Sequence, residues 1–134
     1  MKDYCHKYIV GVVVIIEAQG KILALKRTQK EESSPGVWEN IAGKVEAEDD
    51  LLGAVYREIQ EESGLKAEVD PAPIGIIKTR RNDDDMFLIC YKAKYISGDV
   101  KLSEEHDEYA WLTPEEFSNK TIFPKLAEMV REHF

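Results

Sequence analysis

A chain of 134 residues is long enough to bury a hydrophobic core without disulfides, and we expect one domain over residues 1–134. Its composition, 43% hydrophobic and 33% charged, is ordinary for a soluble globular protein. A formal net charge of −8 argues against nonspecific binding to nucleic acid or anionic membranes, and no apolar run reaches the ~18 residues of a membrane span.

The first third of the chain predicts a β-hairpin followed by a short strand. Residues 8–17 are rich in β-branched side chains and nearly continuously apolar, which is typical of a central strand covered on both faces. Gln19 and Gly20 form a turn, and residues 21–27 alternate between polar and apolar side chains, so the two segments are expected to pair. Residues 37–41 predict a short strand after a polar loop.

The middle of the chain predicts one long amphipathic helix between Asp50, a plausible N-cap, and Gly64, a plausible left-handed residue after the last turn. Apolar residues recur at helical spacing; they are Leu51, Leu52, Val55, Tyr56 and Ile59. Glu58, Glu61 and Glu62 fall within a sector of about 100°. Glu62 lies within the apolar stripe, so a carboxylate is expected on the buried face in the last turn.

Three further strands are expected after this helix. They are residues 66–69, 74–79 and 86–95, with a charged and solvated hairpin loop at residues 80–85 between the last two. A fourth short strand, residues 109–112, follows an acidic loop.

Two helices are expected at the C-terminal end. Thr113 and Glu116 form a capping box that begins a short helix, which ends near residue 118 or 119. Residues 123–134 have apolar side chains at helical spacing and predict a terminal helix that packs by one face.

The two cysteines, Cys5 and Cys90, lie far apart and have no metal-ligand spacing. They are interpreted as free thiols in a reducing compartment, with Cys90 in an apolar core strand. The N-terminal region lacks a signal-peptide layout, so a cytoplasmic protein is expected.

The acidic end of the long helix is unfavourable by itself. Like charges three and four residues apart repel, and these lie near the negative end of the helix dipole. Arg57 offsets one of them, most naturally Glu61, four residues further on. Clustered oxygen ligands without Cys or His favour Mg²⁺ or Mn²⁺ over zinc. The pattern predicts a divalent-cation site, and a solvated acidic helix face is the alternative.

This stretch also resembles the Nudix box, GX5EX7REUXEEXGU, in which U is aliphatic. The matching positions are Gly43, an acidic residue at 49, and the run Arg57-Glu58-Ile59-Gln60-Glu61-Glu62-Ser63-Gly64-Leu65. Asp49 stands where the family has Glu, so either the shorter carboxylate serves or Glu48 does after a slip of the loop. Ala42 stands where the family often has a second glycine.

The resemblance implies an α/β fold, the Nudix α/β/α sandwich with a mixed β-sheet flanked by helices. It implies a hydrolase that uses Mg²⁺ or Mn²⁺ to cut a phosphoanhydride bond in a nucleoside diphosphate linked to another group. Glu58 and Glu62 are the expected primary metal ligands and Glu61 a ligand or water-orienting group. Gly43 is expected to contribute its carbonyl, and Arg57 to hold Glu61 in place.

A second segment, Glu105-His106-x-x-Tyr109-x-Trp111, is similar to one in several Nudix hydrolases. There the glutamate approaches the metal from outside the box, so Glu105 is the candidate extra metal ligand or general base. Glu104 and Glu108 are reserves, and a polar loop that only adds solubility is the alternative. His106 is interpreted as an exposed loop residue.

The candidates for substrate contact are Arg27, Trp38, Lys44 and Phe123. For Arg27 the alternative is a solvated strand-end charge, and for Trp38 a core or rim aromatic. A small nucleotide such as a (deoxy)nucleoside triphosphate is the expected substrate.

Several alternatives for function stay open. Within the hydrolase class, they are a dinucleoside polyphosphate or the 5′-triphosphate of an RNA. From other classes, they are a catalytically inactive nucleotide-binding regulator and a diphosphate isomerase, although the isomerase would need a cysteine facing its substrate. The expected assembly is a monomer or a homodimer.

Overall fold

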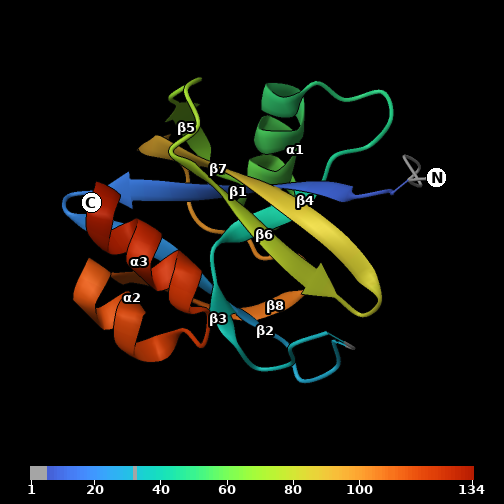
Figure 1. Cartoon of the computed structure of the whole chain (residues 1–134). Coiled ribbons are helices and arrows are strands. Elements are labelled where there is room, and N and C mark those ends of the chain that lie inside the picture. The colour runs from blue at the N-terminus through green and yellow to red at the C-terminus, as the bar shows by residue number, and fades with distance from the viewer. Residues whose placement is uncertain (1–5, 32) are drawn as a thin grey trace.

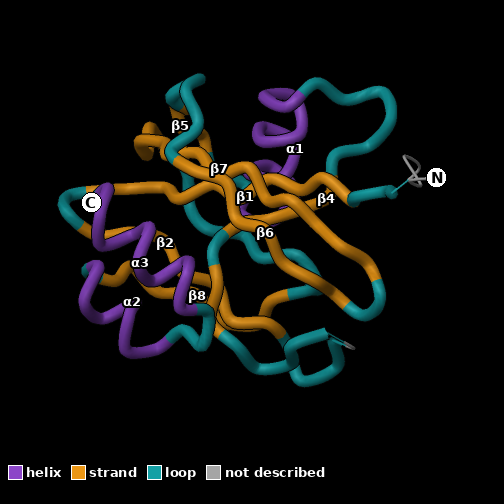
Figure 2. Tube along the Cα trace, viewed as in Figure 1, coloured by secondary structure: helices purple, strands orange, loops and turns teal. Residues whose placement is uncertain are grey.

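The computed structural model describes residues 6–31 and 33–134, and there the chain forms a mixed sheet with helices on both faces (Figures 1 and 2). In chain order the elements are β1 (Ile9–Ala18), β2 (Lys21–Arg27), β3 (Trp38–Glu39), β4 (Ile41–Lys44), α1 (Leu51–Ser63), β5 (Lys66–Val69), β6 (Gly75–Arg81), β7 (Asp84–Ser97), β8 (His106–Leu112), α2 (Pro114–Lys120) and α3 (Pro124–His133). None of these helices is long and apolar enough to cross a membrane.

Strand β1 lies at the centre of the sheet. It pairs in parallel with β7 along almost its whole length, and antiparallel with β2 at one end and β4 at the other. The order along the main path is β3-β2-β1-β7-β5, with β8 beside β2 and β6 beside β7. The predicted hairpin of β1 with β2 is confirmed, and so is the mixed sheet.

The core has two layers, one on each face of β1. Alternate side chains of a strand point to opposite faces. Val12, Val14 and Ile16 therefore pack on the side of α1, whereas Val13 and Ile15 pack on the side of α2 and α3. Figure 1 shows α1 on one side of the sheet and the α2–α3 pair on the other. The expected α/β/α arrangement is confirmed.

Helix α1 begins and ends where its caps were predicted. The side chain of Asp50 accepts a hydrogen bond from the Gly53 N–H, a type of cap that contributes about 1 kcal/mol. Gly64 follows the last turn with a φ of 68°, in the left-handed region that favours glycine. Glu62 is 4% exposed, so the prediction of a buried carboxylate in the last turn is also confirmed.

Two boundaries differ from the sequence prediction. The charged loop expected at 80–85 is mostly strand, because opposite charges face each other across β6 and β7 in the pairs Arg80↔Asp85 and Arg81↔Asp84. The strand expected at 37–41 breaks at the buried Asn40, where the chain leaves β2 and pairs with β1.

The remaining predictions need smaller changes. The capping box of α2 is confirmed, although the helix extends to Lys120. Helix α3 begins at Pro124, with Phe123 at its N-cap position. Cys90 is a buried free thiol, as expected, whereas Cys5 lies outside the described residues.

Candidate active site

The last two turns of α1 place two carboxylates against strand β4. Glu58 is 7% exposed and Glu62 is 4% exposed. A Cβ built on Gly43 would lie 2.0 Å from Glu58 Oε2, so the carboxylate occupies the space that any other residue at position 43 would fill. Gly43 therefore allows the close approach that the sequence predicted, from a strand instead of a loop. The expected role of the Gly43 carbonyl as a metal ligand stays a prediction.

We expect Gly43→Ala to displace the Glu58 carboxylate, because the new methyl group and the carboxylate cannot share one space. Turnover should then fall at least about tenfold, as it does when the geometry of a metal site is disturbed. The measurement is a double-mutant cycle of kcat with Glu58→Ala. Gly43→Ala should add no further loss once the Glu58 carboxylate is absent, and wild-type activity in the single variant would contradict this packing.

Burial and neighbouring carboxylates raise the pKa of both buried glutamates. Burial is the main cause for Glu58, followed by the charge of Glu61, and together they raise its pKa to about 7. Burial also raises the pKa of Glu62 well above the usual range, with further repulsion from Glu58, Glu105 and Glu39. Negative charge at this end of α1 is therefore unfavourable unless a cation is added.

Arg57 holds the loop before α1 onto the helix. Its guanidinium contacts Asp49 Oδ2 at 2.6 Å and Glu58 Oε1 at 3.0 Å, whereas Glu61, the expected main partner, lies farther away at 3.7 Å. Side chains of a helix tilt toward its N-terminus, which explains why Arg57 reaches back to the loop. Of Asp49 and Glu48, Asp49 is therefore the carboxylate that contacts Arg57, and its role as the first acidic residue of the box stays a prediction.

Asp49 is fixed as a charged group. A hydrogen bond from the Glu46 backbone N–H and the contact with Arg57 lower the pKa of Asp49. We expect Asp49→Asn to lower kcat about tenfold, because Arg57 would lose the partner that orients it beside Glu58. Glu48→Gln is the matched control, since Glu48 is exposed, and its kcat should stay at the wild-type value. Equal losses in the two variants would contradict the assignment.

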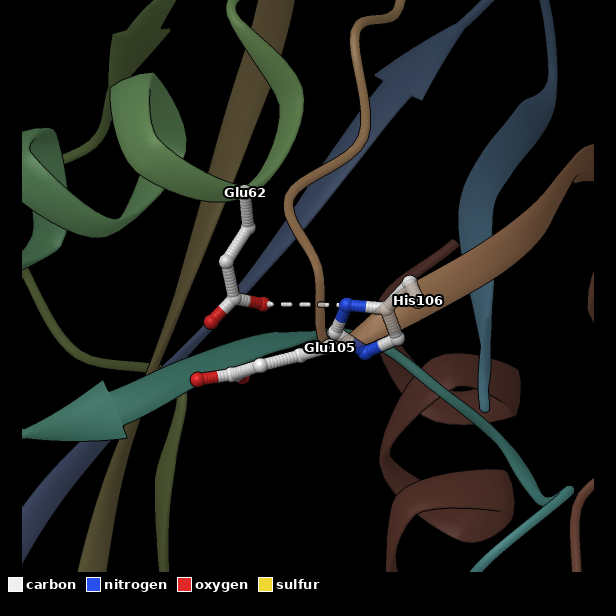
Figure 3. A group of neighbouring side chains, drawn as sticks. All are labelled: Glu62, Glu105 and His106. Carbon is white, nitrogen blue, oxygen red and sulfur yellow. Dashed lines mark ion pairs between the residues drawn. The ribbon is translucent and has the colours of Figure 1, made fainter. Parts of the chain in front are cut away.

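The second part of the site lies outside the box, at the start of β8. The Glu105 side chain is exposed. The backbone carbonyl of Glu105 accepts a hydrogen bond from the Thr28 N–H at 3.0 Å. Figure 3 shows Glu62, Glu105 and His106 converging, and their ligand atoms lie within 4.8 Å of one another. The structure thus brings Glu105 to the buried end of α1.

His106 is not the exposed loop residue that the sequence predicted. It is 3% exposed, and its Nε2 lies 2.8 Å from Glu39 Oε2 on β3. This hydrogen bond offsets the cost of burying the ring. The ring's other nitrogen, Nδ1, has no hydrogen-bond partner among the described residues and lies 4.0 Å from Glu62 Oε1.

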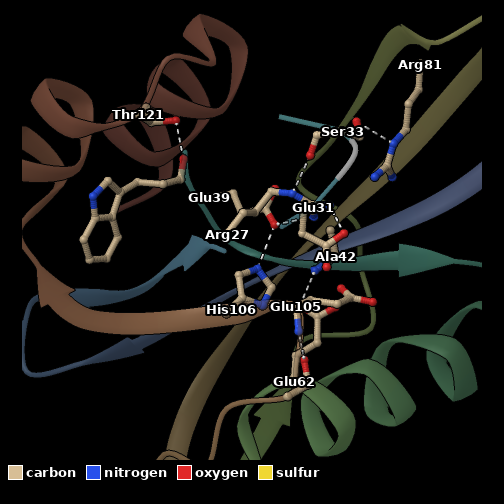
Figure 4. Close-up of polar contacts among 12 residues, drawn as sticks. Arg27, Glu31, Ser33, Glu39, Ala42, Glu62, Arg81, Glu105, His106 and Thr121 are labelled. Carbon is tan, nitrogen blue, oxygen red and sulfur yellow. Dashed lines mark hydrogen bonds and ion pairs between the residues drawn. The ribbon is translucent and has the colours of Figure 1, made fainter. Parts of the chain in front are cut away.

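Arg27 is buried next to this pair, and not a solvated strand-end charge. It donates from Nη1 to Glu39 at 3.1 Å, from Nη2 to Glu31 at 3.1 Å and from Nε to the Ser33 carbonyl at 2.9 Å. A line of polar contacts thus runs from Arg27 through Glu39 to His106 and ends beside Glu62 (Figure 4). A phosphate contact by Arg27 stays a prediction.

The other candidate residues differ in their exposure and in what they pack against. Glu61 is exposed on α1, and Lys44 is exposed on β4 directly after Gly43. Trp38 and Phe123 are half-buried and pack against the core layer on the side of α2 and α3. Trp38 is therefore the core or rim aromatic that the sequence offered as the alternative.

Glu39 is the residue of this site that the sequence interpretation missed. A signal was present, because Glu39 and Asn40 place polar side chains inside a short apolar strand segment. That pattern did not identify the partner, since His106 lies on a different strand, far along the chain.

The residues fit a divalent cation. Two buried carboxylates repel each other, and Arg57 contacts only Glu58 of the two. The glycine at position 43 leaves room for the carboxylate beside the backbone, and the buried Nδ1 of His106 faces Glu62 without a partner among the described residues. Carboxylate oxygens are the ligands that Mg²⁺ and Mn²⁺ accept in proteins.

Comparisons with known proteins agree with this geometry. A family model described as NUDIX domain matches residues 6–133. The CTP pyrophosphohydrolase of Escherichia coli K12 is 31% identical over 121 residues, which cover 88% of this chain and 85% of that protein. A MutT-like protein of Streptomyces ambofaciens is 29% identical over 107 residues, which cover 80% of this chain and 64% of that protein.

A solved structure shows the same fold. The crystal structure of a MutT protein from Methanosarcina mazei Go1 superposes with a TM-score of 0.84 at 26% sequence identity, covering 97% of this chain and 95% of that one. Since the family model spans nearly the whole chain and the box residues gather at one end of α1, this protein belongs to the Nudix hydrolase family.

Proposed function

We propose that this protein is a divalent-cation-dependent pyrophosphohydrolase that cuts a phosphoanhydride bond of a (deoxy)nucleoside triphosphate, releasing the monophosphate and pyrophosphate. The main support is the pair of buried carboxylates, Glu58 and Glu62, with raised pKa values beside Gly43. Such a pair is best explained as a binding site for Mg²⁺ or Mn²⁺.

In this proposal each residue of the site has a separate role. Glu58 and Glu62 hold the ion, and Arg57 fixes Glu58 through its contact at 3.0 Å. When bound, the ion neutralises phosphate oxygens and makes the phosphorus accessible to water. Glu105, exposed and facing the same space, accepts a proton from the attacking water, and Glu61 is the second candidate for orienting that water.

Two observations favour a small substrate. A groove with a volume of about 710 Å³ opens beside His106, within the range that suits a small-molecule ligand. It is lined by Thr28, Gln29, Lys30, Glu31, Glu104, His106 and Asp107. The relative at 31% identity is a CTP pyrophosphohydrolase, so cytidine triphosphates are the first substrates to test.

The test is phosphate release from a nucleotide panel with Mg²⁺ or Mn²⁺, with and without inorganic pyrophosphatase. The panel holds the common nucleoside and deoxynucleoside triphosphates, a dinucleoside tetraphosphate and an RNA with a 5′-triphosphate. We expect phosphate from the triphosphates only when pyrophosphatase is present. Preferential cleavage of the dinucleoside tetraphosphate or of the RNA would assign that compound as the substrate in place of the nucleoside triphosphate. Nucleotide binding without any turnover would favour an inactive regulator.

A further inference from the structure

The buried nitrogen of His106 sets this site apart from one built only of oxygen ligands. Glu62, Glu105 and His106 each offer one ligand atom, and these three atoms lie within 4.8 Å of one another. Glu62 is buried, whereas the Glu105 side chain is exposed to solvent. The sequence indicated oxygen ligands alone, so the imidazole changes the chemistry of the site.

The hydrogen bond to Glu39 determines which nitrogen of the ring is free. A carboxylate only accepts hydrogen bonds, so the contact of 2.8 Å places a proton on His106 Nε2. Arg27 keeps Glu39 in place from the other side, with a contact of 3.1 Å. In the neutral ring, Nδ1 then has a lone pair and no proton.

That lone pair points toward another acceptor. Nδ1 is 4.0 Å from Glu62 Oε1, which is too long for a hydrogen bond, and Nδ1 has no hydrogen-bond partner among residues 6–31 and 33–134. When Glu62 is ionised, two acceptors face each other in the protein interior, and a cation between them would offset the cost of burying both.

Carboxylate, histidine and metal in a row form a recurring arrangement in metal sites, in which the carboxylate orients the ring and makes it a better ligand. Glu39 and His106 supply the first two members here. Ligand atoms on an ion with bonds of about 2.1 Å lie roughly 3 to 4.2 Å apart, so the 4.0 Å between Nδ1 and Oε1 suits a shared ion. One oxygen of the exposed Glu105 carboxylate is free to complete the set, which leaves its other oxygen to accept the proton of the attacking water.

We propose that Glu62, Glu105 and His106 Nδ1 form a nitrogen-containing metal site that prefers Mn²⁺, or a similar transition metal, over Mg²⁺. Imidazole is a good ligand for transition metals, whereas Mg²⁺ prefers oxygen ligands. The inference rests on the proposed function, because Glu62 is shared with the ion held by Glu58. It goes beyond that function by assigning a third ligand type and a metal preference.

The test is Mn²⁺ binding to the untagged protein, followed by electron paramagnetic resonance, with electron spin-echo modulation to detect a coordinated nitrogen. Wild-type protein should show the nitrogen signal, and His106→Gln should lose it and weaken Mn²⁺ binding at least about tenfold. Mg²⁺ binding, measured by competition, should change much less. Manganese that binds to the wild type without a nitrogen signal would overturn the inference.

Matched controls come from the other two histidines, since the chain has three. His6 and His133 are exposed, and the double variant His6→Gln/His133→Gln should keep the nitrogen signal. This variant leaves His106 as the single histidine, so it decides the question even if His106→Gln does not fold. Loss of the signal in it would refute the assignment.

The outcomes also separate this inference from the proposed function. Nucleotide hydrolysis with Mn²⁺ held by oxygen ligands alone would keep the function and end the inference. A folded protein that binds neither ion would contradict both.

Discussion

Glu62→Gln is expected to lower turnover at least about a hundredfold while the protein stays folded. The side chain is 4% exposed, and Glu58, Glu105 and His106 are its neighbours. Glutamine keeps the size of the side chain and one oxygen, but it removes the negative charge that a divalent cation needs. Because burial already disfavours that charge, the metal-free variant should unfold at the same temperature as the wild type or at a higher one.

The measurement is kcat for the preferred nucleotide at saturating Mg²⁺, together with circular dichroism and thermal unfolding. Glu68→Gln is the matched control, because Glu68 is exposed on β5 and the substitution is identical. It should leave kcat unchanged. A Glu62→Gln variant with activity near that of the control would refute the role of Glu62 in holding the ion.

The second large effect is on stability as a function of pH. Glu58 has a pKa of about 7 in the folded protein, and Glu62 is also raised, whereas an unfolded glutamate titrates near about 4.3. The folded protein therefore binds more protons between these values. Its stability is highest below the unfolded pKa and falls as pH rises through about 7 and beyond. We expect the metal-free Tm to fall from pH 5 to pH 8.

Divalent cations should reverse this loss. They compete with protons for the same carboxylates, so the increase in Tm caused by Mg²⁺ or Mn²⁺ should be small near pH 5 and grow toward pH 8. Thermal unfolding with and without metal across this range gives the result directly. Glu68→Gln should behave as the wild type, and Glu62→Gln should show a smaller metal effect. A metal effect that is absent at pH 8 would contradict the site.

The sequence was sufficient for the part of the site that lies on one helix. Local spacing determines which residues share a face of α1, and its caps depend on Asp50 and Gly64, which lie next to the helix. The burial of Glu62 followed from the same spacing. The family resemblance added the roles of these residues, and the family itself is confirmed.

The other part of the site depends on strand pairing, which local patterns do not determine. His106 reaches Glu39 because β8 and β3 both pair with β2, on its two sides. Neither partner is close to the other in the sequence, so His106 was placed in an exposed loop. The choice between Glu48 and Asp49 was open for the same reason, since only the folded loop shows which carboxylate faces Arg57.

The most direct test is anomalous diffraction from crystals of the wild-type protein soaked in Mn²⁺. We expect an anomalous peak in contact with the carboxylates of Glu58 and Glu62, beside Gly43. Crystals that contain no manganese there, at a concentration at which the enzyme is active in solution, would contradict the central claim that these buried glutamates bind the catalytic ion.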